Sequence, residues 1–186
     1  ILKYKDKENW IENTISITMR TPGDDEDLVT GFLFNERVIE KISHIENIVA
    51  SGEPVGQYKL QNKVIITINN SENIDIDKIK RNFLTNSSCG VCGKTSLESL
   101  EIIKKDKILK SIPKIHHEII MKSPDILKQN QSEFSKTGGI HASGLFRANG
   151  EIIAVKEDVG RHNALDKLIG FVLKQNLLDN SSQFLT

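Results

Sequence analysis

Apolar and polar residues alternate in two stretches of the first third of the chain. Residues 13–20 (Asn-Thr-Ile-Ser-Ile-Thr-Met-Arg) are rich in β-branched side chains, and such alternation predicts a half-buried strand. The same pattern predicts a second strand at residues 58–68. These two segments indicate a region that contains a β-sheet near the N-terminus.

A helix is predicted directly after Pro22-Gly23. Residues 24–27 are all acidic, and carboxylates in a first turn face the positive end of the helix dipole. Leu28, Phe32 and Ile39 follow as an apolar stripe at helical spacing. A capped helix explains the acidic cluster better than a metal site does.

The middle of the chain gives weaker signals. Residues 76–84 and 97–103 are predicted to be short helices, and the polar, glycine-containing stretch between them, residues 85–94, is predicted to be a mobile loop. A further helix is predicted at residues 123–134, with Ser123 as its cap and Pro124 at its first position.

The last third of the chain is predicted to form a hairpin, a helix and a strand. Residues 140–146 and 151–156 flank an Asn-Gly turn and predict a β-hairpin. A helix follows at residues 161–175, and residues 183–186 resemble the start of a strand that continues in missing sequence. Together these elements predict an α/β layer fold. The apolar stripe of the helix is Leu165, Leu168, Ile169, Val172 and Leu173.

The composition argues against two kinds of function, nucleic-acid binding and membrane insertion. Lys plus Arg and Asp plus Glu number 25 each among 186 residues, and aromatic residues make up 5%, so neither a basic field nor stacking platforms point to nucleic acid. No apolar run approaches the roughly 20 residues that cross a bilayer. The N-terminus lacks the pattern of a signal peptide, and we expect a cytoplasmic protein with no membrane partner.

The two cysteines, Cys89 and Cys92, lie three positions apart in the predicted loop. Two thiols at this spacing lower the pKa of one of them and leave a reactive thiolate. Three chemistries fit: dithiol–disulfide exchange, half of a zinc site, or carriage of sulfur as a persulfide. A structural zinc site needs about four ligands, and the chain has no second cysteine pair. Dithiol exchange usually has its cysteine pair at the start of a helix. A mobile loop suits a carrier that visits a donor and then an acceptor.

A second candidate site is the charged segment 156–167, directly before the apolar stripe. His162 and Asp166 are four residues apart, and their contact would fix the imidazole tautomer or raise its pKa. Gly160 and the helix start offer backbone N–H groups to an anion, and Arg161 can bind a phosphate with two donors. The competing interpretation is a buried polar network that joins the hairpin to the helix.

The third candidate is the segment that holds Gly138, Gly139 and His141. The glycines permit close approach of a ligand to the backbone, while His141 is either a core histidine or a functional one. A zinc deaminase would need a His-x-Glu motif and a downstream Pro-Cys-x-x-Cys motif. Neither His141 nor His162 has a glutamate two positions on, and the cysteine pair lies upstream of both without a preceding proline. This disfavours deaminase activity even on a shared fold.

These motifs resemble the formate dehydrogenase accessory sulfurtransferase family, FdhD. Four segments carry the resemblance, in the same order as in the family: residues 19–33, 89–93, 137–142 and 157–167. The resemblance implies a cytidine-deaminase-like three-layer main domain at residues 95–186, whose C-terminal part is missing, and a smaller α+β N-terminal region at residues 1–85. The mobile Cys-x-x-Cys loop at residues 86–94 would lie between them.

The resemblance also implies an activity. Cys89 would take persulfide sulfur from a cysteine desulfurase, with Cys92 as its partner, and pass it to the molybdenum or tungsten of a bis-pyranopterin guanine dinucleotide before that cofactor enters formate dehydrogenase. A homodimer without structural metal is expected. The alternative is a non-catalytic chaperone that binds the cofactor. The expected cofactor-binding residues are Gly138, Gly139, His141, Asp158, Gly160, Arg161, His162, Asn163 and Asp166.

Overall fold

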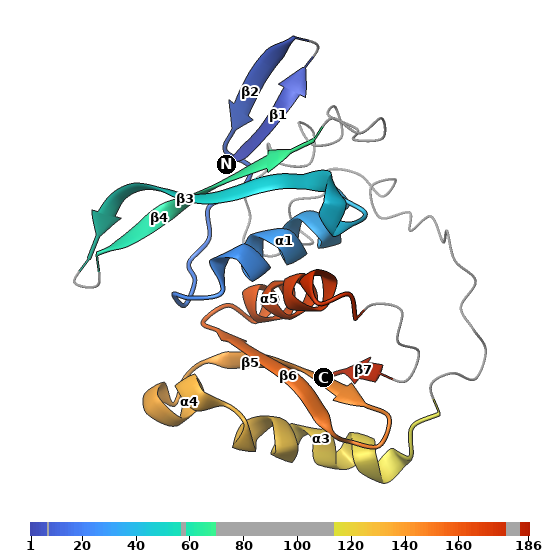
Figure 1. Cartoon of the computed structure of the whole chain (residues 1–186). Coiled ribbons are helices and arrows are strands. Elements are labelled where there is room, and N and C mark those ends of the chain that lie inside the picture. The colour runs from blue at the N-terminus through green and yellow to red at the C-terminus, as the bar shows by residue number, and fades with distance from the viewer. Residues whose placement is uncertain (7, 57–58, 70–113, 178–182) are drawn as a thin grey trace, which may run out of the picture. The chain divides into compact units, whose positions relative to one another are not determined.

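The computed structural model describes residues 1–6, 8–56, 59–69, 114–177 and 183–186. Within these residues the fold is mixed α/β, with two sheets and four α-helices, which confirms the predicted class (Figure 1). The helices predicted at residues 76–84 and 97–103 and the cysteine loop at 86–94 lie outside the described part of the chain.

The chain divides into two compact units. One comprises the described residues of Ile1–Thr18 and Arg37–Ile108, and the other those of Met19–Glu36 and Leu109–Thr186. Residues 19–36 therefore belong with the C-terminal part of the chain, although the sequence placed them in a continuous N-terminal region. The predicted domain bounds themselves stay a prediction.

The first unit is built on a four-stranded sheet with the order β2-β1-β4-β3. Leu2, Tyr4, Ile66 and Ile68 are almost completely buried, and their spacing of two places them on one face of their strands. The strand predicted at residues 58–68 is confirmed as β4. The strands are β1 (Leu2–Asp6), β2 (Asn9–Asn13), β3 (Ile45–Val55) and β4 (Leu60–Ile68), with the short 3-10 helix η1 (Ile42–His44) before β3.

The strand predicted at residues 13–20 is wrong, because the strand in this region, β2, ends at Asn13. Residues 14–20 belong to no strand. The carbonyl of Met19 accepts a hydrogen bond from the side chain of Asn163, 144 residues away. The backbone near the end of this stretch is thus satisfied by a side chain, which no pattern of neighbouring residues reveals.

The second unit consists of a sheet with helices on both faces. Its antiparallel sheet has the order β6-β5-β7. Helix α5 packs on one face of the hairpin, where Leu145 meets Leu168 and Val172, and α3 covers the other face (Figure 1). The predicted hairpin, helix and last strand are confirmed. Their bounds are β5 (His141–Arg147), β6 (Ile152–Asp158), α5 (Arg161–Lys174) and β7 (Gln183–Leu185).

Helix α1 (Asp25–Asn35) packs against α5 at two glycines. A methyl group on Gly31 would overlap the carbonyl of Asp166, and one on Gly170 would overlap the carbonyl of Asp27. The two backbones can approach this closely only because both positions lack a side chain. The predicted helix is confirmed, but its stripe is not complete, since Ile39 lies beyond the helix end.

The helix predicted at residues 123–134 begins earlier than expected. Helix α3 spans His117–Gln129, with Pro124 inside it, and a separate short helix α4 spans Ser132–Thr137. Pro124 has no N–H to donate to the carbonyl of Ile120, four residues before it. The buried Ser123 hydroxyl donates to that carbonyl at 2.9 Å instead, so a Ser-Pro pair that resembles a helix start lies in the helix interior.

Among the described residues, no helix combines the length and the apolar character needed to span a membrane.

The glycine crossing predicts a severe effect of one methyl group. Gly31→Ala should lower the free energy of unfolding by about 3 kcal/mol, because the backbone carbonyl of Asp166 cannot move aside as a side chain could. Gly139→Ala is the matched control, since nothing lies within 4 Å of an added methyl there. Urea unfolding followed by circular dichroism measures both, and equal stability of the two variants would contradict the packing described.

The Ser123–Pro124 pair predicts coupled mutations. Ser123→Ala should lower the free energy of unfolding by about 1 kcal/mol, because it removes the hydroxyl that donates to the carbonyl of Ile120 in place of the N–H that Pro124 lacks. In a Pro124→Ala background the restored N–H should remove at least half of that cost. Ser135→Ala, whose exposed hydroxyl also donates to a helix carbonyl, serves as the control. If the changes that Ser123→Ala and Pro124→Ala cause in the free energy of unfolding are additive, the serine hydroxyl does not replace the missing N–H.

Candidate functional site

Asp158, at the end of β6, is the centre of the polar network in the second unit. Its side chain is completely buried, and its two oxygens accept four hydrogen bonds. Oδ1 accepts from the Gly160 N–H at 2.9 Å and from Asn163 Nδ2 at 3.0 Å. Oδ2 accepts from the Thr21 N–H at 3.0 Å and lies 2.8 Å from Lys167 Nζ. All acceptor positions of this carboxylate are therefore used within the protein.

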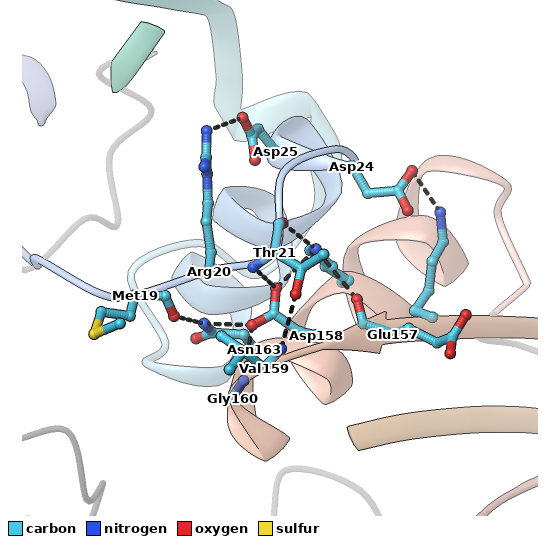
Figure 2. A network of polar contacts seen from close by, with 12 residues as sticks. Met19, Arg20, Thr21, Asp24, Asp25, Glu157, Asp158, Val159, Gly160 and Asn163 are labelled. Atoms are coloured by element: carbon cyan, nitrogen blue, oxygen red, sulfur yellow. Dashed lines mark hydrogen bonds and ion pairs between the residues drawn. The ribbon is translucent and has the colours of Figure 1, made fainter. Parts of the chain in front are cut away.

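Lys167 is the buried counter-charge of Asp158. Its side chain is 2% exposed, and besides the carboxylate its ammonium contacts the carbonyls of Thr21 at 2.8 Å and Glu157 at 3.3 Å. A lysine ammonium has three protons, and each has an acceptor here. The network joins residues 19–21 to β6 and α5 (Figure 2). Asp158, Asn163 and Lys167 therefore form a buried polar network, which was the competing interpretation of segment 156–167.

The acidic first turn of α1 is held by basic side chains. Asp27 lies 2.8 Å from Lys156 Nζ and 3.0 Å from Lys174 Nζ. Burial alone would lower the pKa of Lys156, but hydrogen bonds and charges from Asp27 and Asp24 outweigh it, so its pKa is raised. Asp25 pairs with Arg20 at 2.6 Å. These carboxylates fasten α1 to β6, α5 and the preceding segment.

Glu157 and Gly138 shape the two ends of α4. The Glu157 carboxylate accepts hydrogen bonds from the Glu133 and Phe134 N–H groups at 2.9 and 2.8 Å, which caps the start of α4 from β6. Gly138 ends the helix with φ at +69°, a conformation that glycine adopts at little cost. The predicted binding residue Gly138 therefore has a structural task in ending α4.

Four of the predicted binding residues lie exposed at one end of the hairpin. Gly139 and His141 precede and begin β5, while Arg161 and His162 begin α5. His141 is the register partner of Asp158, so the start of β5 lies beside the end of β6. The first turn of α5 contains no acidic residue, and its free N–H groups carry the positive end of the helix dipole. We call Gly139, His141, Arg161 and His162 the hairpin-end surface.

Asp166 lies apart from His162, although the sequence predicted that the two would touch. Within the described residues no hydrogen bond or ion pair joins them, and Asp166 Oδ1 instead accepts from Asn35 Nδ2 at 2.6 Å. Burial raises the pKa of Asp166 to about 7, the Asn35 hydrogen bond opposes this rise, and the charge of Glu36 adds to it. The carboxylate thus joins α5 to the end of α1.

Sequence reasoning located the charged motif but missed several of its partners. Thr21, Asn35 and the capping role of Glu157 emerge only from contacts between distant segments. Cys89 and Cys92 lie outside the described residues, and the other predicted binding roles stay predictions. In the part of the chain that the structure describes, no group of three or more His, Cys, Asp and Glu side chains is arranged to hold a metal ion.

The raised pKa of Asp166 predicts a pH-dependent stability. The native state holds the proton more tightly than the unfolded chain, whose aspartates titrate near 4. The stability therefore falls as the pH rises from about 4 to about 7. Asp166→Asn keeps an oxygen for Asn35 and removes the charge. The melting temperature of this variant minus that of the wild type should therefore be about 4 °C larger at pH 8 than at pH 5.

Thermal unfolding at the two pH values measures this difference. Asp125→Asn, at an exposed position of α3, is the control and should show no such change. An offset between wild type and Asp166→Asn that is the same at both pH values would refute the titration of Asp166 in this range.

Comparisons with known proteins agree with the motifs. The model of the FdhD/NarQ family matches residues 9–186. Two relatives, each named sulfur carrier protein FdhD, come from Picrophilus torridus and Streptomyces coelicolor. The first is 44% identical over 173 residues, which cover 92% of this chain and 61% of the relative. The second is 41% identical over 162 residues, which cover 86% and 57%. The chain thus spans about three fifths of the length of these curated relatives.

A crystal structure supports the fold. A proposed formate dehydrogenase accessory protein from Desulfotalea psychrophila matches with a TM-score of 0.60 and 24% identity, covering 100% of this chain and 61% of that one. At this identity the likeness concerns the fold, while the family rests on the match over residues 9–186. The chain belongs to the FdhD/NarQ family.

Proposed function

We propose that this chain carries sulfur as a persulfide on Cys89 and delivers it to the molybdenum or tungsten of a bis-pyranopterin guanine dinucleotide destined for formate dehydrogenase. One observation carries the proposal: the family match runs through residues 9–186 and includes the Cys-x-x-Cys segment. Relatives that are 37–44% identical are named sulfur carrier proteins. The activity is that of a sulfurtransferase in the cytoplasm.

The loading step follows from thiol chemistry. The Cys89 thiolate attacks the terminal sulfur of a persulfide on a cysteine desulfurase, a new S–S bond forms, and the desulfurase cysteine leaves as a thiolate. Once the acceptor is bound, Cys92 can attack Sγ of Cys89, which forms a Cys89–Cys92 disulfide and releases the outer sulfur as hydrosulfide. Each step conserves atoms and electrons, and the second gives Cys92 a role in release rather than in loading.

The hairpin-end surface supports binding of the phosphate-rich acceptor. Arg161 and His162 are exposed and, within the described residues, form no ion pair, and the helix start beside them lacks acidic side chains. Backbone N–H groups at a helix start and an arginine fork are the donors that phosphate groups prefer. Asp158 and Asn163 would support this surface from beneath, since their polar groups bond within the protein.

The proposal predicts where sulfur appears. After incubation with a cysteine desulfurase and cysteine, the wild type and Cys92→Ala should gain about 32 Da, the mass of one sulfur atom, and lose it on reduction. Cys89→Ala should gain nothing, because the attacking thiolate is absent. Intact-mass spectrometry makes the measurement, and Ser88→Ala is the matched control from the same segment.

Two results would contradict the proposal. An equal gain of mass in Cys89→Ala would place the sulfur on another residue. No gain in any variant, together with formate dehydrogenase maturation that tolerates Cys89→Ala, would favour a chaperone that binds the cofactor without carrying sulfur.

A further inference from the structure

Residues Met19–Thr21 form a short segment, here called the strap, that four hydrogen bonds join to β6, to α5 and to Val159 between them. The Met19 carbonyl accepts from Asn163 Nδ2 at 2.8 Å, and the Thr21 carbonyl accepts from Lys167 Nζ at 2.8 Å. The Thr21 N–H donates to Asp158 Oδ2 at 3.0 Å. The Val159 N–H donates to the Thr21 hydroxyl at 2.9 Å, as Figure 2 shows.

The fourth bond differs from the other three because its side chain belongs to the strap. The first three use side chains of β6 and α5 to hold the strap, whereas the Thr21 hydroxyl holds the backbone of Val159. Val159 follows the last residue of β6 and stands two residues before the first residue of α5. Thr21 therefore acts on the corner from which Arg161 and His162 project.

This corner has little apolar packing to fix its conformation. The Val159 side chain is 48% exposed, and Gly160 contributes no side chain at all. Polar contacts must then supply the order. Asp158 Oδ1 accepts from the Gly160 N–H at 2.9 Å, the Gly160 carbonyl accepts from the Ala164 N–H at 3.0 Å, and Thr21 Oγ1 accepts from the Val159 N–H at 2.9 Å. The first two join the corner only to the adjoining residues of β6 and α5, so the bond to the Thr21 hydroxyl is the one that joins the corner backbone directly to the strap.

We propose that Thr21 is a positioning residue that fixes the Val159–Gly160 corner and thereby the exposed Arg161 and His162 for binding phosphate groups. The inference rests on the proposed function for its ligand class. A preordered corner loses less conformational entropy when an anion binds, so the hydroxyl strengthens binding without touching the ligand.

Thr21→Val tests this role, because valine keeps the shape of threonine and removes the acceptor. Backbone order parameters of Val159–His162 should fall from about 0.85, the value for a rigid backbone, toward about 0.6. The affinity for inorganic pyrophosphate should fall about tenfold, which matches the loss of one hydrogen bond. Nuclear magnetic resonance relaxation and titration calorimetry measure the two quantities.

Two further variants separate positioning from general destabilisation. Thr21→Ser keeps the hydroxyl and should restore both the order of the corner and the affinity. Thr30→Val is the matched control, since the buried Thr30 hydroxyl on α1 has no partner among the described residues. It should leave the corner and the affinity unchanged.

The outcomes distinguish this inference from the proposed function. A corner that stays rigid in Thr21→Val, or a loss of order that spreads evenly along β6 and α5, overturns the positioning role. A wild-type protein that binds no pyrophosphate contradicts the phosphate-binding part of the proposed function. The order parameters would still decide whether Thr21 fixes the corner.

Discussion

The second unit depends on one buried ion pair, Asp158 with Lys167. Removing two charges from water costs several kcal/mol per ion, and their attraction offsets this only when the remaining hydrogen-bonding positions are filled. Here Asp158 accepts four hydrogen bonds, and Lys167 has three acceptors. Two of these partners are the N–H and carbonyl of Thr21. The pair therefore requires the strap, and this requirement explains why residues 19–36 belong to a unit formed mostly by the end of the chain.

The packing of α1 on α5 rests on a second constraint, the close approach of their backbones at two glycines. Gly31 and Gly170 let the two backbones meet, and this brings the acidic start of α1 within reach of basic side chains. The carboxylates then serve two purposes, because they face the helix dipole and also pair with Lys156 and Lys174. The sequence pattern reveals only the first purpose. The second depends on partners more than 120 residues away in the chain.

Patterns of neighbouring residues predicted those helices and strands that interactions between neighbouring residues determine. The hairpin, α5 and β4 have regular periods and turn residues, and all three are confirmed. The strand predicted at residues 13–20 is wrong because its end bonds to distant side chains. The helix start predicted at Ser123 is wrong because the serine replaces a missing proline donor inside α3. The candidate motif at residues 156–167 was found by its charge density, but no local pattern indicates that residues 19–21 are its partners.

The helical period of α5 nevertheless separates two roles within that motif. Asn163, Ala164, Lys167 and Leu168 are buried, while Arg161, His162 and Leu165 are exposed. A lysine that shares a face with Ala164 and Leu168 must be buried, and a buried lysine requires a carboxylate nearby. The buried face of α5 therefore assigns Lys167 and one aspartate to folding rather than to ligand binding. The stripe predicted from the sequence is wrong at Leu165, which is exposed. The exposed face, with Arg161 and His162, is what the fold leaves free for a ligand.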